Sequence, residues 1–327
     1  MNKLRLLIKN SNHILLGAHV QPDGDAIGAL VAVAGICNFF NIPYTALLEE
    51  VPKRYKDLVE NLNYAQNYEG DFDTFISVDC GDKTRLDKDY RVLFDKANVT
   101  ISIDHHYTTT NFAEYNYVEQ EGSSTCELIY KIIKSLEVEI TDDMAKAIYA
   151  GIVYDTGGFM HSNTSPSTLN TVAYLMKHFK LNYPQIYYNI LRMKTKKQVK
   201  VATIVNNNMY FIKDGLIGLS YISFEEMQEI SATREDMSSA IYEIKNIENV
   251  TIAGFIYPLK QNQYKLSLRS DNPFNVSDVC KKFGGGGHIR ASGAIIEGDL
   301  QSVLAKVQSE LEKLIDYRDE QCSSEIR

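Results

Sequence analysis

The chain has 327 residues, of which 44% are hydrophobic and 23% charged, a composition typical of a soluble protein with two domains rather than one core. Its formal net charge of -8 argues against a broad basic surface for duplex nucleic acid, but leaves room for a short nucleotide held by a few local contacts. The chain lacks an apolar segment of transmembrane length, a signal-peptide pattern and paired cysteine motifs, which predicts a cytoplasmic protein with no membrane partner, disulfide framework or zinc ribbon.

The first predicted strand, at about residues 13–18, is followed by a loop that carries three ionisable side chains. His19, Asp23 and Asp25 occupy this loop, and Gly24 marks a tight turn into an apolar helix at about residues 26–40. Either aspartate could be no more than the N-cap of that helix. A cap needs only one side chain, however, so the His-x3-Asp-x-Asp spacing also indicates a metal site.

A later strand, at about residues 73–78, ends in a loop with two carboxylates. Asp79 and Asp82 could each stabilise the loop as Asx-turn residues. Asp79 is the better candidate for a ligand because it is the first polar residue after the apolar run. We interpret the neighbouring Cys80 as small core packing, since no basic partner for a nucleophile is recognisable nearby.

The β-branched run at residues 99–103 is typical of a buried strand in a parallel sheet, and three ionisable residues follow it: Asp104, His105 and His106. Such groups are costly to bury unless something neutralises them. The carboxyl ends of strands are where open α/β sheets bind ligands. A helix cap and a satisfied core histidine are the structural alternative for this triplet.

Helices dominate the rest of the first domain. The segment at residues 122–125 opens a helix that runs to about residue 136, and the hydroxyls of Ser123, Ser124 and Thr125 are interpreted as its caps. Another helix begins after Thr141 and ends near Asp155, where a carboxylate opposes the helix dipole and a compensating cation would be favourable. Helices are expected at about 166–179 and 183–206, and shorter ones earlier at about 53–62 and in the second domain at about 234–247. We predict a metal-binding domain over 1–190, a helical linker over 191–208 and a substrate-binding domain over 209–327.

The second domain is predicted to be a smaller α/β unit with a mixed sheet, built from hairpins at about 209–222 and 251–270, helices, and a final strand and helix. Its clearest motif is a run of four glycines. Glycines let backbone N–H groups approach an anion, and adjacent imidazole and guanidinium groups suit phosphate. The candidates for substrate binding are Arg269, Ser270, Gly285, Gly286, Gly287, His288 and Arg290.

The ionisable residues at the predicted strand and helix ends form a mixed imidazole and carboxylate set without cysteine: His19, Asp23, Asp25, Asp79, His105 and Asp155. Such a set suits manganese, magnesium or cobalt better than structural zinc. Six ligands exceed the needs of one open catalytic metal but match two metals that share a bridging carboxylate. Paired metals roughly 3.5–4 Å apart are typical of phosphoester hydrolysis.

These motifs, taken in order, resemble those of the DHH phosphoesterases of the DHHA1 subfamily. The matching stretches are residues 19–28, 79–82, 104–106 and 154–159, and the C-terminal Gly-Gly-Gly-Gly-His-x-x-Ala-Ser-Gly. The layout is similar to the stand-alone type that acts as an oligoribonuclease and 3′-phosphoadenosine 5′-phosphate phosphatase. This family's fold implies a mainly parallel sheet flanked by helices in the first domain and an active site in the cleft between the domains.

The resemblance also implies roles for individual residues. One divalent cation, manganese by preference, would be held by His19, Asp23 and Asp79. The second would be held by Asp25, Asp79, His105 and Asp155, with Asp79 shared. Asp104 would orient a ligand histidine, and His106 would contact the scissile phosphate and protonate the leaving oxygen. The glycine motif, His288, Arg290 and Arg269 would bind the substrate's other phosphate.

We therefore expect hydrolysis of short single-stranded oligonucleotides or small nucleotides, with duplex excluded. Hydrolysis of cyclic di-AMP or of pApA is the main alternative within this family. The glycine motif argues against an inorganic pyrophosphatase, and the complete ligand set argues against a non-catalytic nucleotide-binding protein. The sequence does not decide between a monomer and a homodimer.

Overall fold

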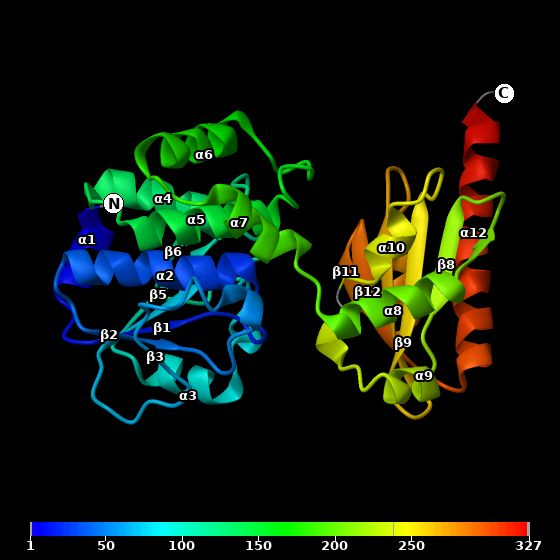
Figure 1. Cartoon of the computed structure of the whole chain (residues 1–327), viewed down its shortest axis with the longest axis horizontal. Coiled ribbons are helices and arrows are strands. Elements are labelled where there is room, and N and C mark those ends of the chain that lie inside the picture. The colour runs from blue at the N-terminus through cyan, green and yellow to red at the C-terminus, as the bar shows by residue number, and fades with distance from the viewer. Residues whose placement is uncertain (1, 238, 326–327) are drawn as a thin grey trace. The chain divides into compact units, whose positions relative to one another are not determined.

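The chain folds into two compact units, residues 1–193 and 194–327, which we call the N-terminal and the C-terminal unit (Figure 1). The computed structural model describes residues 2–237 and 239–325, and side chains as far as residue 316. The expected helix over 183–206 is two helices, because the chain is extended at Met193 and Thr195 caps a new helix there. That second helix packs its Val201 and Val205 into a core of the C-terminal unit, so much of the predicted linker belongs to this unit.

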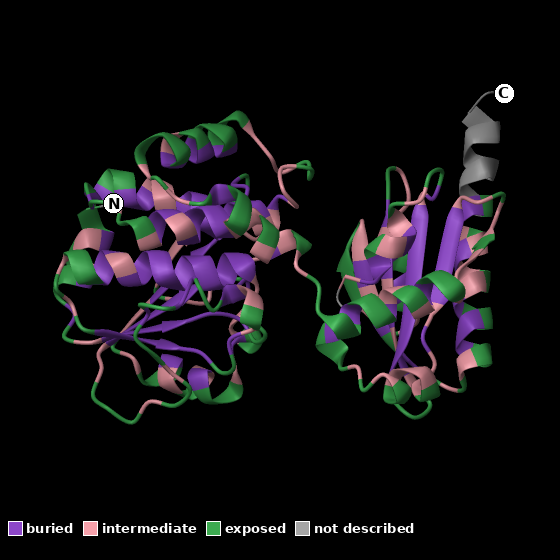
Figure 2. Ribbon diagram, viewed as in Figure 1, coloured by how far each residue is buried: buried purple, intermediate pink, exposed green. Residues whose placement is uncertain are grey.

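The N-terminal unit is built on a parallel sheet, which confirms the predicted fold class. Its described strands lie in the order β3-β2-β1-β4-β5-β6, and every pairing between them is parallel. β1 and β4 are buried along their whole length, as expected for strands with helices on both faces (Figure 2). The strands are β1 (Ile14–Gly17), β2 (Tyr44–Leu47), β3 (Tyr64–Ala65), β4 (Thr74–Val78), β5 (Val99–Asp104) and β6 (Tyr115–Val118).

Helices cover both faces of this sheet. The larger core lies between the sheet and the helices α1, α2, α4 and α5, and the smaller one joins α3 to the opposite face (Figure 1). α2 and α5 approach closely, because a Cβ at Gly28 would stand 2.6 Å from the carbonyl oxygen of Ala147. The helices are α1 (Asn2–Lys9), α2 (Gly24–Phe39), α3 (Lys88–Lys96), α4 (Thr125–Leu136), α5 (Asp142–Asp155), α6 (Pro166–His178) and α7 (Tyr183–Tyr187), and α7 continues into a π-helical turn, Tyr188–Arg192.

The C-terminal unit contains a mixed sheet, as predicted. Its described strands lie in the order β11-β12-β10-β9-β8-β7, and only the β8–β9 pairing among them is parallel. β10 alternates buried and half-buried residues, so one of its faces lies in the core. The strands are β7 (Tyr210–Ile212), β8 (Ile217–Tyr221), β9 (Ile252–Lys260), β10 (Gln263–Ser270), β11 (Gly286–His288) and β12 (Ala291–Glu297).

Two cores flank this second sheet. One packs α11 and α12 against one face, and the other packs α8 and α10 against the opposite face. The helices are α8 (Lys196–Asn207), α9 (Phe224–Glu229), α10 (Ile241–Lys245), α11 (Val276–Lys282) and α12 (Leu300–Glu325).

Two of the expected helices are wrong in extent. The predicted helix over 53–62 is only the 3-10 turn Lys53–Tyr55 followed by turns, and the one over 234–247 is the 3-10 turn Arg234–Met237 followed by the short α10. A third 3-10 turn, Lys83–Arg85, follows β4.

Candidate metal centre

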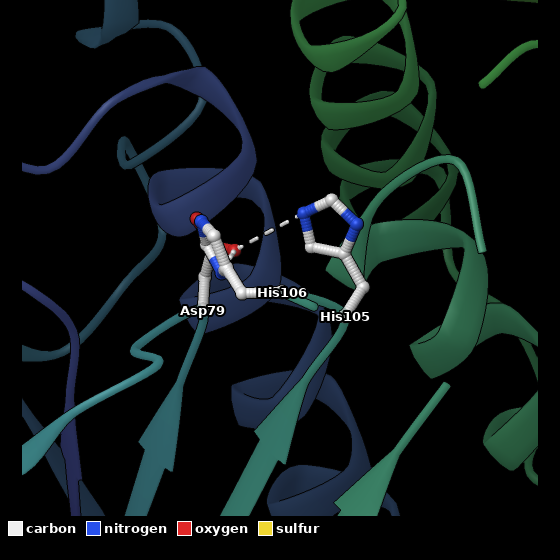
Figure 3. A group of neighbouring side chains, drawn as sticks. All are labelled: Asp79, His105 and His106. Atoms are coloured by element: carbon white, nitrogen blue, oxygen red, sulfur yellow. Dashed lines mark ion pairs between the residues drawn. The ribbon is translucent and has the colours of Figure 1, made fainter. Parts of the chain in front are cut away.

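The structure brings all six predicted metal ligands together beside the carboxyl ends of β1, β4 and β5, with Asp25 on α2 and Asp155 on α5. With His106 added, they form three overlapping groups, and the ligand atoms of each group lie within 4.8 Å of one another. Adjacent positions of β1, β4 and β5 in the sheet explain this, since parallel strands present their carboxyl ends at one edge. The groups are His19, Asp23 and Asp79; Asp25, His105 and Asp155; and Asp79, His105 and His106 (the last is drawn in Figure 3).

Asp79 lies at the centre of this arrangement. Its Oδ2 is 3.8 Å from Nε2 of His19, and its Oδ1 is 3.8 Å from Nε2 of His105 (Figure 3). Both distances are too long for a hydrogen bond, and they leave room between donor atoms. The two oxygens of one buried carboxylate therefore face two different donor groups. Asp79 holds this position with a left-handed backbone, at φ +51°.

The imidazoles of His19 and His105 are fixed by backbone carbonyls. Nδ1 of His19 lies 2.9 Å from the oxygen of Val20, and Nδ1 of His105 lies 3.2 Å from the oxygen of Gly122. Each Nδ1–H can donate to its carbonyl, so Nε2 faces the carboxylates. This orientation is the one that metal-ligating histidines adopt in proteins.

His106 is oriented differently from the other two histidines. Its Nδ1 lies 2.7 Å from Oδ1 of Asp104, so Asp104 orients His106 and not a histidine of the proposed ligand set. This hydrogen bond is the main cause that raises the pKa of His106. Burial opposes ionisation of Asp104, but the hydrogen bond and the charge of His106 outweigh it and lower the pKa of Asp104.

Asp25 is held by the start of α4. Oδ2 of Asp25 accepts from the backbone N–H of Thr125 at 2.6 Å, and Oδ1 accepts from the N–H of Cys126 at 3.0 Å. The hydroxyl of Thr125 donates to Oδ1 of Asp79 at 2.9 Å. The interpretation of the 123–125 hydroxyls as caps is therefore wrong for Thr125 and for Ser123, which donates to the Glu127 side chain, while Ser124 is the N-cap of α4. Cys126, buried with Asp25, was also not singled out by the sequence.

The electrostatics of this centre favour a bound cation. Burial raises the pKa of Asp25 well above its usual range, and repulsion from Asp79 and Asp155 adds to the shift. Burial followed by repulsion from Asp23 raises the pKa of Asp79 to about 6. Burial alone would lower the pKa of His105, but a hydrogen bond to Asp155 and the nearby carboxylates raise it to about 10.

The donor set also fits divalent cations, because its carboxylates have no lysine or arginine partner among the described residues. Within the described residues, the side-chain ion pairs of Asp23, Asp79 and Asp155 are all with histidines, and none is with a lysine or arginine. A positive charge is needed among these carboxylates, and the proton that His105 binds is one way to supply it. Divalent cations would supply it with ligands that magnesium, manganese and cobalt accept.

The predicted substrate-binding residues lie in the C-terminal unit, and the structure distinguishes among them. Gly286, Gly287 and His288 form the exposed strand β11, and Arg269 is half-buried on β10. Ser270 is buried, and its hydroxyl donates to the carbonyl of Phe274. The fold therefore already uses the Ser270 hydroxyl.

The glycine motif has a structural role beside the predicted one. A Cβ at Gly285 would stand 2.2 Å from the carbonyl oxygen of Gly293, and one at Gly287 would stand 2.6 Å from that of Ala291. Around Gly286 there is open space. Arg290 donates through Nη2 to Oδ1 of Asn272 at 2.8 Å, while its Nη1 is buried without a hydrogen-bond partner among the described residues. One nitrogen of the guanidinium is therefore engaged within the unit.

Comparisons with known proteins identify both units. Residues 13–152 match the DHH family, N-terminal domain, and residues 219–315 match the DHHA1 domain, which together make up more than half of the chain. A protein of Thermus thermophilus named bifunctional oligoribonuclease and PAP phosphatase NrnA is 27% identical over 312 residues, 91% of this chain and 90% of that protein. A protein of the same name from Mycoplasma genitalium is 29% identical over 318 residues, 95% and 96% of the two chains.

A solved structure shares the fold. The crystal structure of an exopolyphosphatase-related protein from Bacteroides fragilis superposes with a TM-score of 0.87 at 23% identity and covers 95% of each chain. The matched domains and the curated relatives identify the class of protein as a metal-dependent hydrolase. The chain belongs to the DHH/DHHA1 family of phosphoesterases. A search of the described helices finds none with the length and apolar character needed to cross a bilayer.

Proposed function

We propose that the protein is a two-metal phosphoesterase that hydrolyses short single-stranded oligonucleotides and 3′-phosphoadenosine 5′-phosphate to nucleoside 5′-monophosphates. The observation that carries this proposal is the position of Asp79, whose two oxygens face His19 on one side and His105 on the other. A shared carboxylate is what paired catalytic metals require. The names of the two curated relatives support the choice of substrates.

Two divalent cations complete the proposed centre. One would be held by His19, Asp23 and Asp79, and the other by Asp25, Asp79, His105 and Asp155. Manganese is the preferred metal because imidazole and carboxylate ligands suit it, and magnesium and cobalt accept similar sets. When bound, such cations polarise the phosphoryl oxygens and lower the pKa of a water to supply the nucleophile.

The neighbouring histidine has the role of a proton donor in this proposal. Oδ1 of Asp104 accepts a hydrogen bond from Nδ1–H of His106 and raises the pKa of the imidazole. The ring therefore keeps a second proton, on Nε2, to a higher pH than a free histidine would. A proton there can pass to the leaving oxygen of the nucleotide, which is general acid catalysis by a positioned side chain.

The proposal assigns the substrate's other phosphate to the C-terminal unit. Exposed His288 and the open backbone around Gly286 support this assignment, as does the half-buried cation of Arg269, which lies over the ring of Tyr242. Arg290 and Ser270 contribute less directly, because both already bond within the unit.

We also place the enzyme in the cytoplasm, in line with its four buried free cysteines in the described part of the chain.

The test is product analysis by anion-exchange chromatography. Protein stripped with a chelator and reloaded with Mn²⁺ is incubated with 3′-phosphoadenosine 5′-phosphate, pApA, a short RNA and cyclic di-AMP, with Asp79→Asn as the control variant. We expect nucleoside monophosphates from the first three substrates, little opening of the cyclic dinucleotide, and no product from the variant. Preferred opening of cyclic di-AMP would instead assign the protein to second-messenger turnover. No product at all, with metal bound, would indicate a nucleotide-binding protein.

A further inference from the structure

Thr125, the first residue of α4, contacts two carboxylates of the metal centre at once. Its hydroxyl donates to Oδ1 of Asp79 at 2.9 Å, and its backbone N–H donates to Oδ2 of Asp25 at 2.6 Å. The side chain is fully buried, as is Asp25, and Asp79 is nearly so. These bonds join segments 46 and 100 residues apart in the chain, so they are formed only by the tertiary fold.

The start of α4 does not need this hydroxyl. Ser124 is the N-cap, and its Oγ accepts the N–H of Glu127 at 3.0 Å, as an N-cap side chain normally does. The hydroxyl of Thr125 instead bonds Asp79, which directly follows β4. The contact therefore serves the centre rather than the helix.

Asp25 and Asp79 stand in different donor groups. Asp79 is grouped with His19 and Asp23, whereas Asp25 is grouped with His105 and Asp155. Among the described residues, Thr125 is the one that donates hydrogen bonds to both carboxylates. Thr125 therefore links the two donor groups through hydrogen bonds to one carboxylate of each.

The bond to Oδ1 also restrains rotation of the Asp79 carboxylate. Oδ1 faces His105 and His106, and Oδ2 faces His19, so a rotation would displace a donor oxygen from both groups. Hydrogen bonds to ligating carboxylates hold the geometry that a metal requires, and their loss typically costs 10- to 100-fold in metal affinity or activity.

We propose that Thr125 is a positioning residue that holds the Asp25 and Asp79 carboxylates in fixed positions relative to each other. Metal binding by the two donor groups then depends on the Thr125 hydroxyl. This inference rests on the proposed function only in that these aspartates hold the cations. It assigns Thr125 no contact with substrate.

The experiment compares Thr125→Val, which removes the hydroxyl at nearly constant volume, with Thr125→Ser, which keeps it. Thr168→Val is the matched control, because Thr168 is equally buried and its hydroxyl donates to Glu127 instead of a metal-site carboxylate. Mn²⁺ is titrated into each metal-free protein by isothermal titration calorimetry, and thermal unfolding of the metal-free proteins is followed in parallel. Turnover at saturating Mn²⁺ then gives kcat and KM.

We expect Thr125→Val to weaken Mn²⁺ binding about 10- to 100-fold and to lower kcat while KM changes little. Thr125→Ser should keep an Mn²⁺ affinity close to that of the wild type. Thr168→Val should lower the melting temperature without changing Mn²⁺ affinity. If Thr125→Val lacks a cooperative unfolding transition, Thr125→Ala is measured in its place.

Wild-type Mn²⁺ affinity in a folded variant without the hydroxyl would overturn the inference, as would an equal loss of affinity in Thr168→Val or Thr125→Ser. The titration needs no turnover. A wild-type protein that binds Mn²⁺ but hydrolyses no nucleotide would contradict the proposed function, while the affinity comparison would still decide the role of Thr125. Absence of Mn²⁺ binding in the wild type would overturn both.

Discussion

Nδ1 of His106 lies 2.7 Å from Oδ1 of Asp104, the last residue of β5. Asp104 is fully buried, and its other oxygen, Oδ2, has no hydrogen-bond partner among the described groups. Among the described residues, His106 is therefore the hydrogen-bond partner of the Asp104 side chain. The charge state of each residue depends on the other.

Replacing Asp104 by asparagine should move the pH dependence of the reaction. The hydrogen bond to Asp104 raises the pKa of His106, so its loss lowers that pKa towards or below the ordinary value. An acid catalyst is lost as the pH rises through its pKa, so the alkaline limb of the kcat/KM profile should shift to lower pH in Asp104→Asn. The measurement is the pH–rate profile at saturating Mn²⁺. An alkaline limb that does not move would contradict the role of His106 as proton donor.

Asp79→Asn should change how the stability of the metal-free protein depends on pH. Because the pKa of Asp79 rises from 3.8 to about 6 on folding, the folded state binds this proton more tightly than the unfolded state. The contribution of this bound proton to the free energy of unfolding is present at low pH and is lost as the pH rises from about 4 to 6. The asparagine of the variant cannot titrate, so the wild type should lose on the order of 2–3 kcal/mol relative to the variant across this window.

Chemical denaturation of both metal-free proteins at pH 4.5 and 7 measures this difference. Mn²⁺ at pH 7 should stabilise the wild type more than the variant, because binding to the folded state alone raises its stability. A difference between the proteins that is the same at both pH values would show that Asp79 does not titrate in this range.

Gly151→Ala should weaken metal binding from outside the ligand set. A Cβ at Gly151 would lie 2.6 Å from Oδ1 of Asp25 and 2.3 Å from Sγ of Cys126, so the Asp25 carboxylate must move. We expect about tenfold or greater loss of Mn²⁺ affinity together with a destabilisation of about 1–3 kcal/mol.

Gly35→Ala is the control for overpacking between α2 and α5, because its Cβ would meet the flexible Met144 side chain instead of a carboxylate. It should change the melting temperature and leave Mn²⁺ affinity as in the wild type. Equal affinity losses in the two variants would assign the effect to helix packing and not to Asp25.

His288→Ala should affect substrate binding more than Arg290→Ala. His288 is exposed on β11, whereas the guanidinium of Arg290 is engaged by Asn272 and partly buried. Loss of one hydrogen bond to a charged phosphate costs about 1.5–3 kcal/mol, which corresponds to a KM roughly tenfold or more higher on a dinucleotide. Steady-state kinetics on pApA at saturating Mn²⁺ provide the comparison. A larger KM increase in Arg290→Ala would reverse the assignment.

The sequence could predict the candidate metal centre because most of its proposed ligands follow recognisable strands. Asp79 and His105 come directly after or close to apolar, β-branched runs, and parallel pairing then places the ends of β4 and β5 side by side. The parallel sheet and the grouping of the ligands that follow strands result from this pattern, whereas the mixed second sheet follows from the predicted hairpins. Asp155 is an exception, because its position follows from the end of a helix, where its carboxylate opposes the helix dipole.

Other features depend on tertiary distances that the sequence does not contain. The hydroxyl of Thr125 resembles a cap in sequence, and only the folded position of α4 places it against Asp79. The pairing of Asp104 with His106 depends on side-chain directions at the end of β5. Arg290 looks free in its motif, but a turn 18 residues away provides its partner Asn272.

The left-handed backbone at Asp79 limits which residues can replace it over evolution. A left-handed backbone at φ +51° favours glycine, asparagine and aspartate over most other residues, so these residue types fit position 79 best. Of these, only aspartate would bring two charged oxygens to the proposed cations. A relative with asparagine or glycine here would keep the backbone conformation and lose the shared carboxylate, so the residue at this one position offers a way to sort active from inactive sequences.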